Sequence, residues 1–153
     1  MNKIKAYWEN FQKHNPSYSS MGEPQSIYFC ATKEEADACA LLVVQKVKQA
    51  TSPSLWWFEK YGERLPEIGD LSIVTDWDNQ PKAVIKTTAV AIVKFKDVTS
   101  AYAFIEGEGD KSLAYWKKVH WNYYANEMKA FGDYPDEEMD VVCEYLKLFG
   151  LNC

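Results

Sequence analysis

Apolar residues recur with helical spacing at the start of the chain. In residues 3–14 they fall three or four positions apart, so they share one face of a helix. These apolar positions are Ile4, Tyr7, Trp8 and Phe11. The Asn15-Pro16 pair ends the pattern, because a residue before proline disfavours helical geometry. The pattern predicts a short amphipathic helix over residues 3–14, as an extension ahead of the rest of the domain.

A second helix is predicted from a capping box. Thr32 can accept a hydrogen bond from the backbone three residues on, and Glu35 can reach back to Thr32. An apolar stripe then continues at helical spacing through Ala36, Ala40, Val43 and Val47. We expect this helix to extend to about Gln49.

Runs of β-branched and apolar residues predict strands in the middle and at the end of the chain, because such residues fit a pleated sheet. The runs occupy residues 71–75, 83–95 and 139–149, and residues 26–30 are predicted to add a short strand. The segment between the first two runs is rich in turn-forming residues.

Two further helices are predicted between the second and third strand runs. Thr99 can cap a helix through Ile105 that Gly107 would end, and Ser112 can cap a longer helix to about Phe131. Helices and strands are mixed without regular βαβ alternation, so the predicted fold class is α+β. A chain of 153 residues has the usual length of one domain, and we expect a single domain over the whole chain.

The charge of the chain restricts its partners. A formal net charge of −5 argues against non-specific binding of long nucleic acid, so DNA is not expected as a partner. A basic cleft on an acidic body remains compatible with this charge. Its candidate residues are four lysines in one strand-like region, Lys82, Lys86, Lys94 and Lys96, for which a solvated face is the simpler interpretation.

The cysteines carry no recognisable pattern. Cys30, Cys39, Cys143 and Cys153 form no CxxC pair and have no metal-ligand spacing. Since no signal peptide is apparent, we expect reduced thiols in a cytoplasmic protein. No apolar run approaches the length of a membrane span, and two histidines argue against a His-rich metal site. We therefore expect no metal ion, no cofactor and no membrane partner.

Lys48 and Thr51 are the first candidates for chemistry. Pro53 forces Ser52 out of helical geometry, so Lys48 is expected in the last turn of the second helix and Thr51 at or beyond its end. A lysine in a partly dry cleft loses its proton more easily and could activate a threonine hydroxyl as nucleophile. The structural alternative is a lysine that complements the helix dipole.

The segment Glu106-Gly107-Glu108-Gly109-Asp110 holds three carboxylates in five residues. The simple interpretation is a solvated turn between helices. The functional one places a carboxylate in a cleft, as a proton carrier or as the partner of a base amino group.

Two aromatic features leave alternatives open. Trp116 and His120 lie one helical turn apart, either as a core-facing pair or as the wall and polar contact of a site. The Trp56-Trp57-Phe58 run either forms a stacking surface or closes one end of a barrel. Phosphate-binding, nucleophile-elbow and zinc-deaminase motifs are absent from the sequence.

The order of these motifs resembles that of the ASCH family. Members carry a GxKxxT/S motif after an early helix, and Lys46-Val47-Lys48-Gln49-Ala50-Thr51 matches it except that Lys46 stands in place of the glycine. The run EGEGD from Glu106, followed by Ser112-Leu113, Trp116 and His120, is similar to a signature of the longer members. The similarity extends from about residue 26 to the C-terminus.

The resemblance implies a PUA-like mixed β-barrel flanked by helices, with a cleft that binds RNA or a nucleoside. Some members hydrolyse N4-acylated cytidines with a Lys, a Thr and a Glu. On this basis Lys48 would be the base, Thr51 the nucleophile and Glu106 the acid, without metal. Ligand-binding residues would be Glu108, Ser112, Trp116 and His120. The alternatives are a non-catalytic RNA-binding module and a ribonuclease, and oligomeric state is not predicted.

Overall fold

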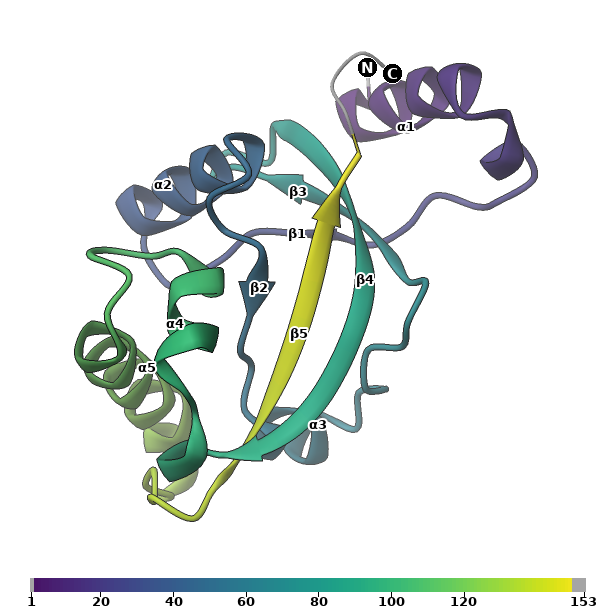
Figure 1. Ribbon diagram of the computed structural model, residues 1–153. Helices are drawn as coiled ribbons and strands as arrows, with labels where there is room; N and C mark the ends of the chain where they lie inside the picture. Colours follow the sequence, from purple (N-terminus) through teal and green to yellow (C-terminus); the bar gives the residue numbers. More distant parts are fainter. Residues whose placement is uncertain (1, 150–153) are drawn as a thin grey trace.

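In the computed structural model, which describes residues 2–149, one five-stranded mixed sheet runs through the domain (Figure 1). The strands are β1 (Ser26–Ile27), β2 (Ala50–Thr51), β3 (Leu71–Thr75), β4 (Pro81–Lys94) and β5 (Asp140–Leu148). Their order across the sheet is β1-β3-β4-β5-β2, in which β1 and β3 are parallel and the other neighbours antiparallel.

Five α-helices surround this sheet in the described part of the chain: α1 (Lys3–His14), α2 (Lys33–Val44), α3 (Leu55–Tyr61), α4 (Ser100–Glu106) and α5 (Leu113–Met128). Short 3-10 turns cover Pro16–Tyr18, Phe95–Asp97 and Lys129–Phe131. None of the helices in residues 2–149 combines the length and the apolar character needed to cross a membrane.

Helices pack on both faces of the sheet at its β3 end. Trp8 and Phe11 of α1 pack with Ile73 and Val84 on one face. The alternate residues of the same strands, among them Val74, pack against α2 on the other face. Successive side chains of a strand point to opposite faces, so β3 is buried at all five positions and lacks the apolar–polar alternation of a half-exposed strand.

The long curved strands β4 and β5 extend to the other end of the domain, where α4 and α5 lie next to each other on one side of the sheet (Figure 1). Their ladder shifts register between Thr87 and Ala89, which marks a bulge in β4. The edge strands of the sheet, β1 and β2, do not pair with each other, so the described strands form an open sheet. The α+β class is confirmed, whereas the mixed β-barrel expected from the resemblance is not shown, because the sheet of residues 2–149 is not closed.

The predicted helix to about Gln49 ends earlier, at Val44. The backbone N–H of Lys46 donates to Val43 O and that of Val47 to Leu42 O, the two bonds of a Schellman cap. Lys46 adopts a left-handed conformation with φ of +61°. This explains why a glycine suits the position, because glycine adopts that conformation without steric cost.

Pairing with β5 explains the early end of the helix. Ala50 and Thr51 lie opposite Tyr145 and Glu144, and a strand needs extended backbone. The helix α3 was also not predicted, although Ser54 caps its start and Gly62 ends it with φ of +63°. The strand predicted over residues 26–30 is limited to Ser26–Ile27, and the other helices and strands lie close to their predicted positions.

Replacing Lys46 by glycine is expected to raise the free energy of unfolding by about 0.5–1 kcal/mol. Glycine relieves the left-handed strain of about 1–2 kcal/mol but costs part of that gain through the freer unfolded chain. Urea unfolding of Lys46→Gly beside wild type measures the change. An unchanged or lower stability would contradict the cap described above.

Candidate functional site

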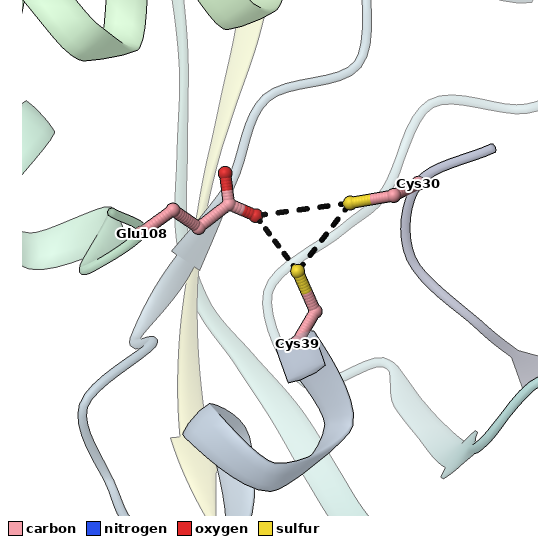
Figure 2. A group of neighbouring side chains, drawn as sticks. All are labelled: Cys30, Cys39 and Glu108. Carbon is pink, nitrogen blue, oxygen red and sulfur yellow. Dashed lines mark hydrogen bonds between the residues drawn. The ribbon is translucent and has the colours of Figure 1, made fainter. Parts of the chain in front are cut away.

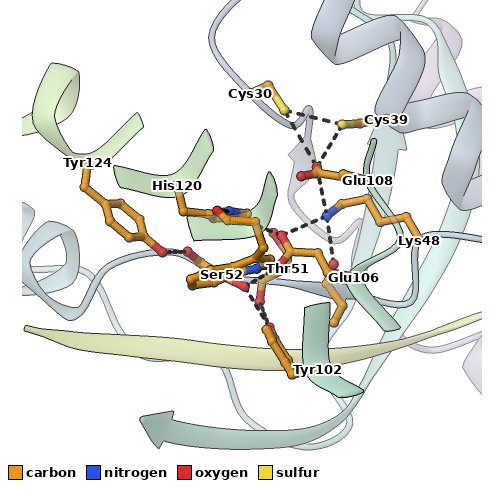
Figure 3. A network of polar contacts seen from close by, with 12 residues as sticks. Cys30, Cys39, Lys48, Thr51, Ser52, Tyr102, Glu106, Glu108, His120 and Tyr124 are labelled. Atoms are coloured by element: carbon orange, nitrogen blue, oxygen red, sulfur yellow. Dashed lines mark hydrogen bonds and ion pairs between the residues drawn. The ribbon is translucent and has the colours of Figure 1, made fainter. Parts of the chain in front are cut away.

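Lys48 lies between α2 and β2 rather than in a helix, and its side chain is buried. Its Nζ donates to Ala50 O at 2.8 Å and lies 3.3 Å from Oε1 of both Glu106 and Glu108 (Figure 3). The Phe29 ring also faces the ammonium, with its centroid 5.0 Å away. A buried charge is costly unless it is paired, so these contacts explain how the ammonium is tolerated.

Backbone contacts hold the two carboxylates against the lysine. The Gln49 N–H donates to Ile105 O at 2.9 Å, which joins the segment after α2 to the end of α4. Gly107 ends α4 with φ of +77°, and a Cβ built there would lie 2.2 Å from Val47 O. This position therefore requires glycine both for its conformation and for the close approach of the two backbones.

Glu106 is fully buried and receives four donors. Its Oε1 accepts from Lys48 Nζ and from His120 Nε2 at 2.9 Å. Its Oε2 accepts from Ser52 Oγ at 2.6 Å and from Trp116 Nε1. A carboxylate with this many donors is strongly stabilised in its charged form, and it has little capacity left for a ligand.

His120 is part of this network rather than an isolated core residue. Its ring stacks on Trp116 at 4.1 Å between centroids. Its Nδ1 lies 2.7 Å from Trp116 O, and because a carbonyl only accepts, Nδ1 must carry a hydrogen. Burial by itself lowers the pKa of His120, but the charge and hydrogen bond of Glu106 outweigh it and raise that pKa above its ordinary value.

The charges of Lys48 and Glu106 oppose the roles expected from the resemblance. Burial lowers the pKa of Lys48, but the charges of Glu106 and Glu108 raise it above its ordinary value. Burial raises the pKa of Glu106, but the charges of Lys48 and His120 lower it well below its usual range. At neutral pH the resting pair is an ammonium and a carboxylate. Lys48 is thus a poor resting base, and Glu106 is a poor resting acid.

The other predicted site residues fall into two groups. Glu108 and His120 lie in the same network as Lys48 and Glu106 (Figure 3). Trp116 belongs to it as well, because its Nε1 donates to Glu106. Ser112 caps α5, accepting from the Tyr115 N–H at 3.1 Å. The Thr51 side chain is half-buried and makes no hydrogen bond with any of residues 2–149, although its backbone oxygen accepts from Tyr102.

Ser52, Tyr102 and Tyr124 belong to the network and were missed in the sequence. The Ser52 hydroxyl lies 2.8 Å from the Tyr102 hydroxyl as well as bonding Glu106. The Tyr124 hydroxyl donates to Ser52 O at 2.6 Å. The adjacency of Ser52 to Thr51 is the only signal that could have drawn attention to it. Neither tyrosine stands out among ten.

Glu108 has a more open environment than Glu106. Its side chain is 13% exposed, and its Oε1 receives Lys48 together with the thiol of Cys39 at 3.1 Å. Its second oxygen, Oε2, receives no hydrogen bond from residues 2–149. Glu108 is therefore the carboxylate of the network that retains capacity for a ligand.

Gly107→Ala is expected to lower the free energy of unfolding by more than about 2 kcal/mol, because strain at positive φ adds to a clash with backbone. Gly62→Ala is the matched control: its φ is +63°, but an added Cβ meets nothing within 4 Å. The control should cost only about 1 kcal/mol. Equal losses in urea unfolding would show that the contact with Val47 is unimportant.

Ser52→Ala is expected to lower the free energy of unfolding by about 1–3 kcal/mol, because Glu106 loses a buried donor. The neighbouring Thr51→Val, which keeps the side-chain shape, should change it by less than about 0.5 kcal/mol. Thermal and urea unfolding of both variants would check this contrast. A larger loss for Thr51→Val would mean that its hydroxyl has a structural role.

Comparisons with known proteins agree with this architecture. The ASCH domain family matches residues 25–149. A crystal structure of an ASCH domain from Lactobacillus crispatus JV V101 superimposes with a TM-score of 0.90 and 31% identity, covering 97% of this chain and 94% of that one. A crystal structure of a protein from Enterococcus faecalis V583 has a TM-score of 0.88 and 28% identity, covering 96% and 88%. No curated protein matches the chain. The chain belongs to the ASCH domain family.

Proposed function

We propose that this domain binds a nucleoside-like ligand, free or as part of RNA, at the side of the network formed by Lys48, Thr51 and Glu108. We further propose that it hydrolyses an N-acylated cytidine-type amide there. The observation that carries the proposal is the open Oε2 of Glu108 on a carboxylate whose other oxygen lies 3.3 Å from the Lys48 ammonium. An acceptor and a cation side by side suit the polar edge of a base.

The chemistry of cytosine fits this pair. A carboxylate accepts the exocyclic N–H of cytosine, which is the recognition expected of Glu108 Oε2. Two of the three contacts of Lys48 are long, at 3.3 Å, so one of its hydrogens can turn toward a carbonyl oxygen. A neutral nucleoside also suits a chain with a net charge of −5, because it carries no phosphate.

The resting charges of Lys48 and Glu106 favour catalytic roles that differ from those implied by the resemblance. Thr51, whose hydroxyl has no partner among residues 2–149, supplies the oxygen that attacks the acyl carbon. Lys48 stabilises the negative charge that develops on the carbonyl oxygen. The attack forms an ester between Thr51 and the acyl group while the amide C–N bond breaks, and the hydroxyl proton passes through the Lys48–Glu106 pair to the departing nitrogen. Water then hydrolyses the ester, which releases the acid and restores Thr51.

The alternative of RNA binding through the lysine group has less support. Lys82 lies 3.6 Å from Asp76, and both Lys94 and Lys96 pair with Glu138. These carboxylates neutralise much of the charge that phosphates would need. A ribonuclease would use the same Lys48, but the Glu106 and Glu108 carboxylates beside it would repel the charged phosphate of RNA more than a neutral nucleoside.

Incubation with N4-acetylcytidine, followed by mass spectrometry, tests the hydrolysis. Wild type should release cytidine without added metal, and Glu106→Gln should slow the release by about 100-fold or more. Thr51→Val should lose a similar factor while keeping its fold. Thr51→Val is the sharper variant, because Thr51 contributes little to the buried network. Isothermal titration with cytidine measures binding separately.

An absence of cytidine release by wild type would contradict the hydrolase proposal. Cytidine binding that depends on Glu108 would then leave a binding module. RNA cleavage that needs the 2′-hydroxyl would point to the ribonuclease instead.

A further inference from the structure

We propose that Cys30, Cys39 and Glu108 form a binding site for a thiophilic divalent cation, with Zn²⁺ as the best fit. This site goes beyond the proposed function and does not require it. Thiolate and carboxylate ligands are typical of protein zinc sites. The sequence shows no ligand spacing that would predict it, because the three residues belong to different parts of the chain.

The donor atoms already lie near the separations that zinc requires (Figure 2). The two Sγ atoms are 3.4 Å apart, and Glu108 Oε1 lies 3.1 Å from Cys39 Sγ and 4.0 Å from Cys30 Sγ. Tetrahedral zinc with Zn–S bonds of about 2.3 Å and a Zn–O bond of about 2.0 Å needs about 3.8 Å between sulfurs and about 3.5 Å from sulfur to oxygen. Each pair needs a shift of about 0.5 Å or less.

The fold brings the three donors together from separate segments. Cys39 is on the buried face of α2, and Glu108 follows α4. Cys30 lies in the loop before α2 with φ of +70°, a conformation that non-glycine residues rarely adopt. Strained backbone of this kind is concentrated at functional sites, and here it occurs at the residue whose thiol meets the other two donors.

Charge balance favours the exchange of two protons for one cation. Before binding, the group holds two neutral thiols, the Glu108 carboxylate and the adjacent Lys48 ammonium, with a net charge of zero. Zn²⁺ with two thiolates, Glu108 and Lys48 also sums to zero. The bond that Cys39 donates to Glu108 Oε1 would be replaced by a bond of each atom to the metal. A buried site can therefore take the ion without an uncompensated charge.

A second group of possible ligands, Glu106, Glu108 and His120, is less suitable. Lys48 Nζ lies 3.3 Å from both carboxylates and would repel a cation between them. His120 Nε2 and Glu106 are also already bonded to each other. On the cysteine side, the Lys48 ammonium also lies 3.3 Å from Oε1 of Glu108, but the two thiolates that form on binding offset its repulsion of the cation.

Three protein ligands leave the fourth position of a tetrahedral ion for water or a ligand, as in catalytic zinc sites. Cys30 is half-buried, which gives the ion a route from solvent, whereas Cys39 is buried. The ion would anchor the Cys30 loop to α2 and to the loop after α4. The Glu108 carboxylate would then contact both the ion and the Lys48 ammonium.

Cobalt titration tests the site on protein kept reduced and freed of metal with a chelator. Wild type should bind one equivalent of Co²⁺, with thiolate-to-cobalt charge-transfer absorption that Zn²⁺ removes by displacement. Cys30→Ser and Cys39→Ser should each weaken binding by about 100-fold or more, since loss of even an outer partner costs 10–100-fold. Glu108→Gln should weaken binding while keeping the thiolate absorption.

Cys143→Ala is the matched control, because Cys143 is a buried thiol outside the group, and it should bind as wild type does. Circular dichroism confirms folding, and if Cys39→Ser fails to fold, the half-buried Cys30→Ser decides. Two outcomes would overturn the site. The first is that reduced wild type binds no Co²⁺, even if a mild oxidant joins Cys30 and Cys39 in a disulfide. The second is that Cys30→Ser binds Co²⁺ as tightly as wild type. None of these readouts depends on nucleoside hydrolysis.

Discussion

The burial of the Lys48 ammonium is the constraint on which the rest of this site depends. A charge removed from water must be matched nearby, and here two carboxylates from the end of α4 match it. Glu106 then requires its own donors, which come from α5 and from the segment after β2. One buried charge thus ties together four parts of the chain.

The two carboxylates next to Lys48 differ in what they can do. Glu106 is enclosed by four donors, so it is held as a carboxylate and joins the residues of the network to one another. Glu108 is partly exposed, has an open oxygen and borders two thiols, so it is the point at which a ligand or an ion can join the network. Gly107 between them positions both, because its backbone lies against Val47.

Predictions from short sequence patterns were correct where a structure depends mainly on contacts between residues close in sequence. The capping residues Thr32, Thr99 and Ser112 begin helices as predicted, since a cap depends on neighbours three residues away. The predicted end of α2, at about Gln49, was wrong, because pairing of Ala50 with Tyr145 of β5 competes with the helix. The predicted mixed β-barrel is not shown by the described strands for a related reason: whether edge strands meet depends on the curvature of the whole sheet.

By itself, the sequence determined the α+β class, most helices and strands, and the polar residues from which a site could be built. The predicted site residues that the structure joins in one network are Lys48, Glu106, Glu108, Trp116 and His120. Only the tertiary structure decided their protonation, because the partner of Lys48 lies 58 residues away and a pKa depends on distance and burial rather than on sequence position. It also decided that Ser52 bonds Glu106 while the Thr51 hydroxyl has no partner in residues 2–149, and that Cys30 and Cys39 meet Glu108. Such contacts arise when separate segments pack, and no spacing along the chain encodes them.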